Sequence, residues 1–318
     1  MKLSAQQVYT KLQSQNLTSF RGSIQFKFGG VDVNVCQKDV VGNIIQEWLQ
    51  KWFDKEGIEY AVNENTQMPP DFFLNPDNKE QNMLEVKAFN YDSAPGFDIA
   101  DFTMYATEIR DNPYMLDVDY LIFGYSMDSA GVVSIKDFWL KKVWEITRRG
   151  DTYPLFIQVK RDQIHKIRPA IWYRDDRSDF SPFLSIEDFV SAIEQTIHNA
   201  SGKLSSDIKE VTWRSTFLKN YKNYYHTKLS IPRWDDIEDK YDLRIIRAKK
   251  KAIEARDEAQ RKLEKCKFRV STWEDKLADA HTTKQKEKAE QSLNKAKAAL
   301  SKATLDLTTK QSILDQLG

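Results

Sequence analysis

The chain has 318 residues, of which 41% are hydrophobic and 12% aromatic, enough for one large folded domain or two ordinary ones. Its 48 Lys and Arg side chains almost balance 47 Asp and Glu, and the net charge of +1 excludes a uniformly basic nucleic-acid coat but not a local basic patch. The two cysteines, Cys36 and Cys266, are too few for a disulfide framework or a zinc site. The N-terminus lacks the apolar core of a signal peptide, and no apolar run approaches the length of a transmembrane helix. We therefore expect a cytoplasmic protein with reduced thiols.

The composition changes near residue 240. All nine prolines lie at or before Pro232, and from residue 241 onward the chain is rich in Lys, Ala, Glu, Leu and Gln, which is the composition of helices. Residues 241–318 hold 19 Lys and Arg against 12 Asp and Glu, a net charge of +7, so the remainder is net −6. The sequence thus predicts a mildly acidic body over 1–240 and a basic segment over 241–318.

The body mixes helical and strand patterns, which is typical of an α/β (α+β) domain with a mixed sheet flanked by helices. The helix expected at 39–55 is amphipathic, and its broad apolar face includes Ile44 and Trp48. In chain order, the patterns predict a helix at 3–15, a strand hairpin at 24–28 and 31–35 turning at Gly29-Gly30, a helix at 39–55, strands at 71–74 and 83–89, a helix at 99–110, strands at 119–125, 131–135, 155–160 and 164–173, and helices at 185–198 and 210–225.

Two apolar seams with heptad spacing run through the basic C-terminal segment. The first steps by three and four residues from Leu263 to Ala280, and the second from Leu293 to Leu317, with Lys310 as its one charged member. A His-Thr-Thr-Lys stretch interrupts the pattern between them. We expect two long helices folded back as an antiparallel coiled-coil hairpin, and pairing between two chains is the alternative.

Three residues of the body could carry chemistry together. In the strand expected at 83–89, Glu85 and Lys87 alternate with apolar residues, so a strand places them side by side on one face. Asp71 opens the preceding strand, and its carboxylate can approach that of Glu85. Two neighbouring carboxylates repel each other unless a cation lies between them, and their hard oxygens suit Mg²⁺. A lysine beside them can hold an attacking water near a scissile phosphate.

The spacing of these residues is a weak signal by itself, because a Pro-Asp upstream of an acid-x-Lys triplet is common by chance. Asp77-Asn78-Lys79 is another such triplet, but it lies in a polar turn. The competing interpretation is an ordinary ion pair between Glu85 and Lys87 on a surface strand.

Longer strings around these residues carry a resemblance to a known family. Pro70-Asp71 with Glu85-Val86-Lys87 resembles the PD-(D/E)xK nuclease signature, and the surrounding sequence is similar to type II restriction endonucleases of the NgoBV/NlaIV family over about residues 1–240. The strings that carry this similarity are Lys38–Leu49, Met68–Asp71, Phe73–Pro76, Glu85–Tyr91, Pro95–Phe102, Pro113–Val118, Tyr120–Tyr125, His165–Pro169 and Ile231–Trp234.

The resemblance implies a restriction-endonuclease-like fold and a Mg²⁺-dependent enzyme of a bacterial restriction-modification system. Such an enzyme cuts duplex DNA at a short palindrome, here GGNNCC, and is accompanied by a cognate DNA methyltransferase. By position, Asp71 and Glu85 would be metal ligands, Val86 would ligate through its backbone carbonyl, and Lys87 would be the catalytic lysine. Glu47, near the edge of the apolar face of the 39–55 helix, is a further catalytic candidate, and a solvated helix-edge carboxylate is the alternative for it.

A GG/CC target is read best by Arg or Lys in the major groove. We prefer Lys166, Arg168 and Arg174 as DNA-contacting residues, and the pairs Lys141-Lys142, Arg148-Arg149 and Lys160-Arg161 are further candidates. A phosphate contact or a solvated charge is the alternative for each. A palindromic target and one active site per chain also imply a two-fold homodimer.

The basic C-terminal segment departs from the family pattern, and the resemblance gives it no role. It could supply the dimer contact, clamp the DNA backbone, or be a solvated hairpin. Two rival functions remain for the whole chain: a structure-specific repair or junction nuclease of the same fold, and a non-catalytic DNA-binding coiled-coil scaffold.

Overall fold

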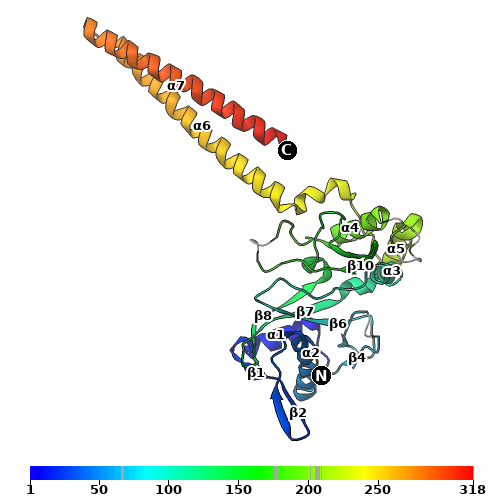
Figure 1. The fold of residues 1–318 in the computed structure, drawn as a ribbon. Helices are drawn as coiled ribbons and strands as arrows, with labels where there is room; N and C mark the ends of the chain where they lie inside the picture. The colour runs from blue at the N-terminus through cyan, green and yellow to red at the C-terminus, as the bar shows by residue number, and fades with distance from the viewer. Residues whose placement is uncertain (66–67, 175–177, 201, 205–207, 209, 318) are drawn as a thin grey trace. The chain divides into compact units, whose positions relative to one another are not determined.

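The computed structural model describes residues 1–65, 68–174, 178–200, 202–204, 208 and 210–317 (Figure 1). The chain forms two compact units, Met1–Tyr241 and Asp242–Gly318. None of the helices within the described ranges combines the length and apolarity that crossing a bilayer requires.

A six-stranded mixed sheet lies at the centre of the first unit, as the sequence predicts. Its strand order is β1-β8-β7-β6-β5-β4; β6 and β7 are parallel, and the other neighbours are antiparallel. The strands of this sheet are β1 (Arg21–Ser23), β4 (Ala61–Val62), β5 (Phe72–Phe73), β6 (Met83–Asn90), β7 (Asp119–Met127) and β8 (Val132–Lys142). Two further pairs form separate small sheets, β2 (Gln25–Phe28) with β3 (Val31–Asn34), and β9 (Ile157–Lys160) with β10 (Gln163–Ile167).

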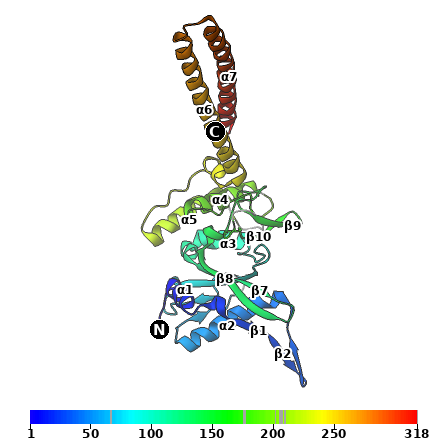
Figure 2. The ribbon, with the colours of Figure 1, turned by 90° about the vertical axis from the view of Figure 1, so that its left-hand side faces the viewer.

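Helices cover both faces of the six-stranded sheet. Helices α1 and α2 lie against one face, and α3, α4 and α5 lie on the other side (Figures 1 and 2). The α-helices of this unit are α1 (Ala5–Ser14), α2 (Val41–Glu56), α3 (Phe102–Asp111), α4 (Ile186–Asn199) and α5 (Glu210–Tyr225). Short 3₁₀ turns connect them at Leu17–Ser19, Lys38–Val40, Pro113–Asp117, Val143–Ile146, Trp234–Asp236 and Glu238–Tyr241.

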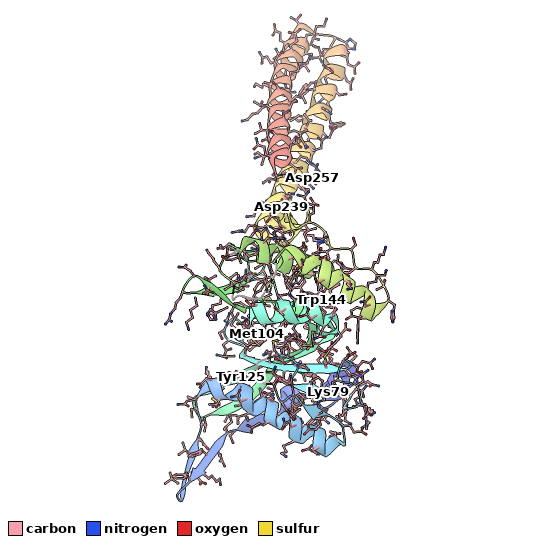
Figure 3. The ribbon with its side chains drawn as sticks, turned by 90° about the vertical axis from the view of Figure 1, so that its right-hand side faces the viewer. Lys79, Met104, Tyr125, Trp144, Asp239 and Asp257 are labelled. Atoms are coloured by element: carbon pink, nitrogen blue, oxygen red, sulfur yellow. The ribbon has the colours of Figure 1, made fainter. Side chains whose placement is uncertain are left out.

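The alternation of β6 divides its side chains between two hydrophobic cores. Leu84 and Val86 belong to the core that contains α1 and α2, whereas Phe89 belongs to the core on the opposite face. Strand β7 is apolar on both faces, as expected for an inner strand. The hydroxyl of Tyr125, labelled in Figure 3, donates a 2.6 Å hydrogen bond to the carbonyl of Lys38 and so connects β7 to the 3₁₀ turn that precedes α2.

Two expected strands differ from the observed ones. The strand expected at 131–135 is only the beginning of β8, which continues to Lys142. The strand expected at 164–173 ends at Ile167, and its pairing with β9 lies outside the main sheet. Pro169 explains the early end, because it has no N–H to donate to a neighbouring strand. Strands β1 and β4 were not expected; with three and two residues, they are too short to produce an alternating pattern.

The second unit is an antiparallel pair of long helices, as the heptad pattern predicts. Helix α6 (Leu243–Ala278) ends just before a tight turn, and Thr282 caps the start of α7 (Thr283–Gln316) in a capping box with Gln285. Leu263 and Val270 of α6 and Leu293 and Ala296 of α7 are buried members of the predicted seams. Three further buried residues, Ala252, Ala259 and Ala289, precede the predicted starts of these seams.

Candidate active site

Strand β6 carries Glu85 and Lys87 on the same face, as their alternation with Leu84 and Val86 predicts. Nζ of Lys87 lies 2.7 Å from Oε1 of Glu85. The Glu85 carboxylate is almost fully buried, with a side-chain exposure of 6%, whereas that of Lys87 is 21%. This is therefore not the exposed surface ion pair that was the competing interpretation, because such pairs keep both groups in water.

Asp71 lies immediately before β5 and meets β6 through a backbone hydrogen bond. The β5–β6 register pairs Phe72 with Leu84. The amide nitrogen of Val86 donates to Oδ2 of Asp71 at 2.7 Å. The Asp71 carboxylate is thus fixed next to the Glu85–Lys87 pair by long-range strand pairing.

Burial and charge shift the acid–base properties of all three groups. Burial raises the pKa of Glu85 to about 7; the Asp71 charge acts in the same direction, and Lys87 opposes both. Burial also raises the pKa of Asp71 above its ordinary value, against the hydrogen bond from Val86 and the charge of Lys87. For Lys87, burial alone lowers the pKa, but the Glu85 carboxylate outweighs it, and the net pKa lies above its ordinary value.

These residues line a cavity of about 440 Å³ that is mostly polar. Five carboxylates and two lysines face it, together with backbone and amide groups from α2 and from the segment before α3. The charged residues of the lining are Asp39, Asp71, Glu85, Lys87, Asp98, Asp101 and Lys166. This excess of negative charge in a partly dehydrated space attracts cations and repels a phosphate that arrives without one.

The donor set of the cavity fits a hard divalent cation. Asp71 and Glu85 supply carboxylate oxygens, which are the ligands that Mg²⁺ prefers. One or two carboxylates commonly hold Mg²⁺, and waters and substrate phosphates complete its octahedral coordination. In the described part of the chain, no three His, Cys, Asp or Glu side chains converge as a complete metal cage. A closed structural site of zinc type therefore does not fit these residues, whereas an open magnesium site does.

Helix α2 reaches the cavity through Gln46. Its Nε2 donates a 2.8 Å hydrogen bond to Oδ1 of Asp71. Glu47, the helix residue expected here, is exposed and is not part of the cavity lining. Adjacent helix positions differ in direction by about 100°, so the side chain one step earlier faces the site instead. Sequence reasoning missed Gln46 because it considered only acidic residues of this helix.

The three expected DNA-contacting residues have different surroundings. Lys166 lines the cavity, with its Nζ 3.9 Å from Oδ2 of Asp101. Arg168 is bound by an ion pair with Asp98 and by a 3.0 Å hydrogen bond to the carbonyl of Gly96. Arg174 lies over the ring of Tyr91, with its guanidinium carbon 5.0 Å from the ring centroid.

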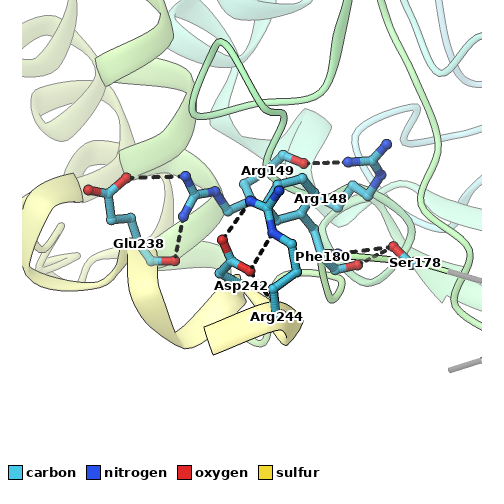
Figure 4. Close-up of polar contacts among 7 residues, drawn as sticks. All are labelled: Arg148, Arg149, Ser178, Phe180, Glu238, Asp242 and Arg244. Carbon is cyan, nitrogen blue, oxygen red and sulfur yellow. Dashed lines mark hydrogen bonds and ion pairs between the residues drawn. The ribbon is translucent and has the colours of Figure 1, made fainter. Parts of the chain in front are cut away.

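The Arg148-Arg149 pair is engaged in contacts within the first unit (Figure 4). Nη1 of Arg149 donates to the carbonyl of Glu238 at 3.1 Å, and Nη2 lies 3.5 Å from the Glu238 carboxylate. The guanidinium of Arg148 lies 3.7 Å from the ring centroid of Phe156. Arg149 thus holds the last 3₁₀ turn of the unit through Glu238, and Arg148 packs on an aromatic ring.

Comparison with known proteins shows the family of the chain. The profile of the NgoBV restriction endonuclease family matches residues 2–241. The type II restriction enzyme NlaIV of Neisseria lactamica is 52% identical over 243 residues, which cover 76% of this chain and 98% of that protein. The type II restriction enzyme NgoBV of Neisseria gonorrhoeae is 51% identical over 162 residues, 51% of this chain and 92% of that protein.

A solved structure extends the similarity to the fold. The NlaIV restriction endonuclease superimposes with a TM-score of 0.72 at 52% identity, over 76% of this chain and 98% of that one. The family match ends at residue 241, so the helical hairpin of the second unit lies beyond it.

Proposed function

The chain belongs to the NgoBV restriction endonuclease family and is a type II restriction enzyme, a site-specific deoxyribonuclease, and we propose that it hydrolyses duplex DNA with Mg²⁺ at GGNNCC. One observation carries the choice of site: Asp71, Glu85 and Lys87 converge in a single acidic cavity. The proposed target comes from the resemblance of the sequence to its family.

Each residue of the cavity has a proposed role in this reaction. Asp71 and Glu85 would hold the cation, together with the backbone carbonyl of Val86. Bound Mg²⁺ supplies Lewis acidity, which polarises the phosphodiester and stabilises the departing oxygen. Lys87 stays protonated beside Glu85 and would hold the attacking water or stabilise charge on the phosphate. Gln46 would orient Asp71, and it replaces Glu47 in our assignment.

We assign Lys166 to direct contact with DNA, since it is the basic residue that lines the cavity besides Lys87. Arg168 would position the loop at Asp98 through its ion pair, and Arg174 would present its charge over the Tyr91 ring. Contacts to phosphate fix the register of DNA, whereas contacts to base edges select the sequence.

A homodimer follows from the proposed target, because cutting both strands of a palindrome takes two symmetric active sites. We propose that the β2–β3 hairpin supplies part of the contact with the second copy. It stands away from the rest of the first unit (Figures 1 and 2), and one of its faces is apolar and exposed. The register pairs Phe26 with Val33 and Phe28 with Val31, with exposures of 58, 48, 76 and 61% respectively.

An apolar hollow of about 260 Å³ adjoins this hairpin and offers a matching surface. Ile24, which leads into β2, lines it together with the half-exposed Ile44 and Trp48 of α2. A two-stranded hairpin is marginally stable alone, and an apolar strip of this kind is commonly covered by a partner. The symmetry required by the palindrome makes a second copy of this chain the proposed partner.

Two further proposals follow from the function. The host genome contains the same short palindrome, so a cognate DNA methyltransferase would have to protect it. The enzyme would act in the bacterial cytoplasm, where incoming DNA and the genome are both present.

The proposed function is tested by digesting a plasmid of known sequence with Mg²⁺ and, in parallel, with EDTA. We expect discrete fragments whose ends map to GGNNCC, and no cleavage in EDTA. If the fragment ends map to a different single palindrome, the proposed target is wrong but the restriction endonuclease function stands. Cleavage at branched structures without sequence preference would instead support a repair or junction nuclease, and binding without cleavage under several divalent metals would support a scaffold.

A further inference from the structure

The charges of the helical hairpin are unevenly distributed around it. A helix turns by about 100° per residue, so the position of each charge relative to the buried seam follows from its number. On one side of α6, about 80–160° around the helix from its buried seam, lies a row of seven cations and two anions. The cations of this row are Arg244, Arg247, Lys251, Lys262, Lys265, Arg269 and Lys276, and the anions are Glu254 and Glu258.

Helix α7 repeats this asymmetry on the same side of its own seam. Four cations, Lys284, Lys288, Lys295 and Lys302, lie there with one anion, Asp306, while Lys310 lies in the seam itself. The two helices run in opposite directions and their seams face each other. Viewed from one end of the hairpin, residue number therefore increases clockwise around one helix and anticlockwise around the other. The flanks on the same side of each seam therefore share one face of the hairpin, which we call the basic face and define by these eleven cations.

Contacts across the seam support this assignment of faces. Lys262 of α6 and Asp306 of α7, both assigned to the basic face, interact electrostatically. Lys297 of α7 and Glu274 of α6, both assigned to the other side, form an ion pair at 3.3 Å.

The basic face is strongly positive and the rest of the hairpin is not. Eleven cations stand against three anions on the basic face, a net charge of +8, while the remaining eight cations and nine anions give −1. Several cations of this face, among them Lys265, Arg269 and Lys295, are exposed and have no ion-pair partner within the described part of the chain. Neighbouring like charges repel one another, so a polyanion that neutralises this excess of cations would be bound favourably.

We propose that the basic face binds the phosphate backbone of duplex DNA, outside the recognition site and without regard to sequence. This proposal rests on the proposed function, because the DNA is the substrate of the first unit. From Arg244 to Lys276 the row is about 48 Å long, at about 1.5 Å per residue. That length corresponds to about 14 base pairs at about 3.4 Å each, so several phosphates can be contacted together.

The composition of the basic face favours duplex DNA over other polyanions. Single-stranded nucleic acids are held largely by stacking on aromatic rings, and the exposed ring of the hairpin, Phe268, lies away from this face. An anionic membrane is bound by helices with a broad apolar face next to a basic one. Here the apolar seam lies between the helices, and the exposed Ile246 and Ile253 lie on the other flank of α6. Of the exposed aliphatic side chains in α7, Leu305 lies away from the basic face and Ile313 lies on its side, and one such residue does not make a broad apolar face.

The test compares two full-length variants with the same loss of charge. The basic-face variant carries Arg269→Gln, Lys288→Gln, Lys295→Gln and Lys302→Gln, and the control carries Arg261→Gln, Lys250→Gln, Lys267→Gln and Lys286→Gln from elsewhere on the hairpin. Fluorescence anisotropy in EDTA measures binding to a 30-base-pair duplex without GGNNCC over a range of salt concentrations, and circular dichroism verifies that both variants keep their helices.

Each phosphate contact contributes about 0.9 to the slope of log Kd against log salt concentration. We therefore expect the basic-face variant, which removes four contacts, to lose about 3.6 from this slope and to bind at least about tenfold more weakly at 100 mM salt, while the control loses less than about 1. If the quadruple variant does not fold, Lys295→Gln alone should lower the slope by about 1.

Equal losses in both variants, or no loss in the basic-face variant, would overturn the proposal. So would loss of binding to phosphatidylserine vesicles, or to single-stranded RNA, with duplex binding retained. Cleavage of the cognate plasmid by wild type is scored separately in Mg²⁺. If wild type cleaves but the basic-face variant keeps the wild-type salt slope, the proposed role of the basic face is rejected and the nuclease function stands. If the salt slopes are as expected but wild type does not cleave, the nuclease function is rejected and the role of the basic face stands.

Discussion

The amide of Gln46 in α2 donates a 2.8 Å hydrogen bond to the carboxylate of Asp71, which lies just before β5. This bond connects a helix on one side of the sheet to the site at the end of the β5–β6 pair. It occupies Oδ1 of Asp71, while the Val86 amide nitrogen occupies Oδ2. The carboxylate is therefore fixed in one orientation before any cation or DNA binds.

We predict that replacing Gln46 with Ala lowers the rate of DNA cleavage by about 10- to 100-fold, the usual cost of losing a partner that orients a metal ligand. Glu47→Ala is the matched control, because Glu47 is the next residue of the same helix but is exposed. Single-turnover cleavage of a GGNNCC duplex measures both. A large loss in Glu47→Ala with a normal rate in Gln46→Ala would reverse our assignment.

The pH dependence of metal binding gives a second prediction. Because burial raises the pKa of Glu85 to about 7, its carboxyl is largely protonated at pH 6 and ionised at pH 8. A cation needs the ionised form. As the pH rises toward 7, the Mg²⁺ concentration for half-maximal cleavage should therefore fall by about tenfold per pH unit, and above pH 7 it should level off. The same Mg²⁺ requirement at pH 6 and pH 8 would show that Glu85 does not titrate in this range or does not hold the metal.

The apolar face of the β2–β3 hairpin is predicted to stabilise a dimer. Changing Phe26 and Phe28 to Ser removes two large apolar side chains from this face and should convert the dimer to a monomer, as measured by light scattering. The control changes Lys27 and Asp32, an exposed ion pair on the opposite face of the same hairpin, to Ser. A double Phe variant that remains dimeric would place the dimer contact elsewhere.

Regular side-chain periodicity is what made much of the fold and the centre of the site predictable. The alternation in β6 correctly places Glu85 and Lys87 together, because a strand leaves no other choice of face. The Gly29-Gly30 turn was also predictable, since both residues have positive φ, at 59 and 82°. The heptad seams likewise predicted the two long helices of the second unit.

What the sequence does not predict depends on long-range geometry. The apolar face of α2 suggested that Ile44 and Trp48 would be buried, yet they are 38 and 40% exposed, because the core covers only part of that face. The hydrogen bond from Val86 to Asp71 depends on the register of a two-residue strand, for which local sequence carries almost no signal. The choice between Gln46 and Glu47 likewise depends on the rotation of α2 against the sheet.

The most direct test of the account is single-turnover cleavage of a GGNNCC duplex in Mg²⁺ by Lys87→Ala. Lys142→Ala is the control, because Lys142 is also a partly buried lysine, paired with Asp119 at 2.8 Å, but lies outside the cavity. We predict that Lys87→Ala cleaves at least about 10²-fold more slowly than wild type while binding the duplex equally well, and that Lys142→Ala cleaves at nearly the wild-type rate. Wild-type cleavage by Lys87→Ala would contradict the assignment of the active site.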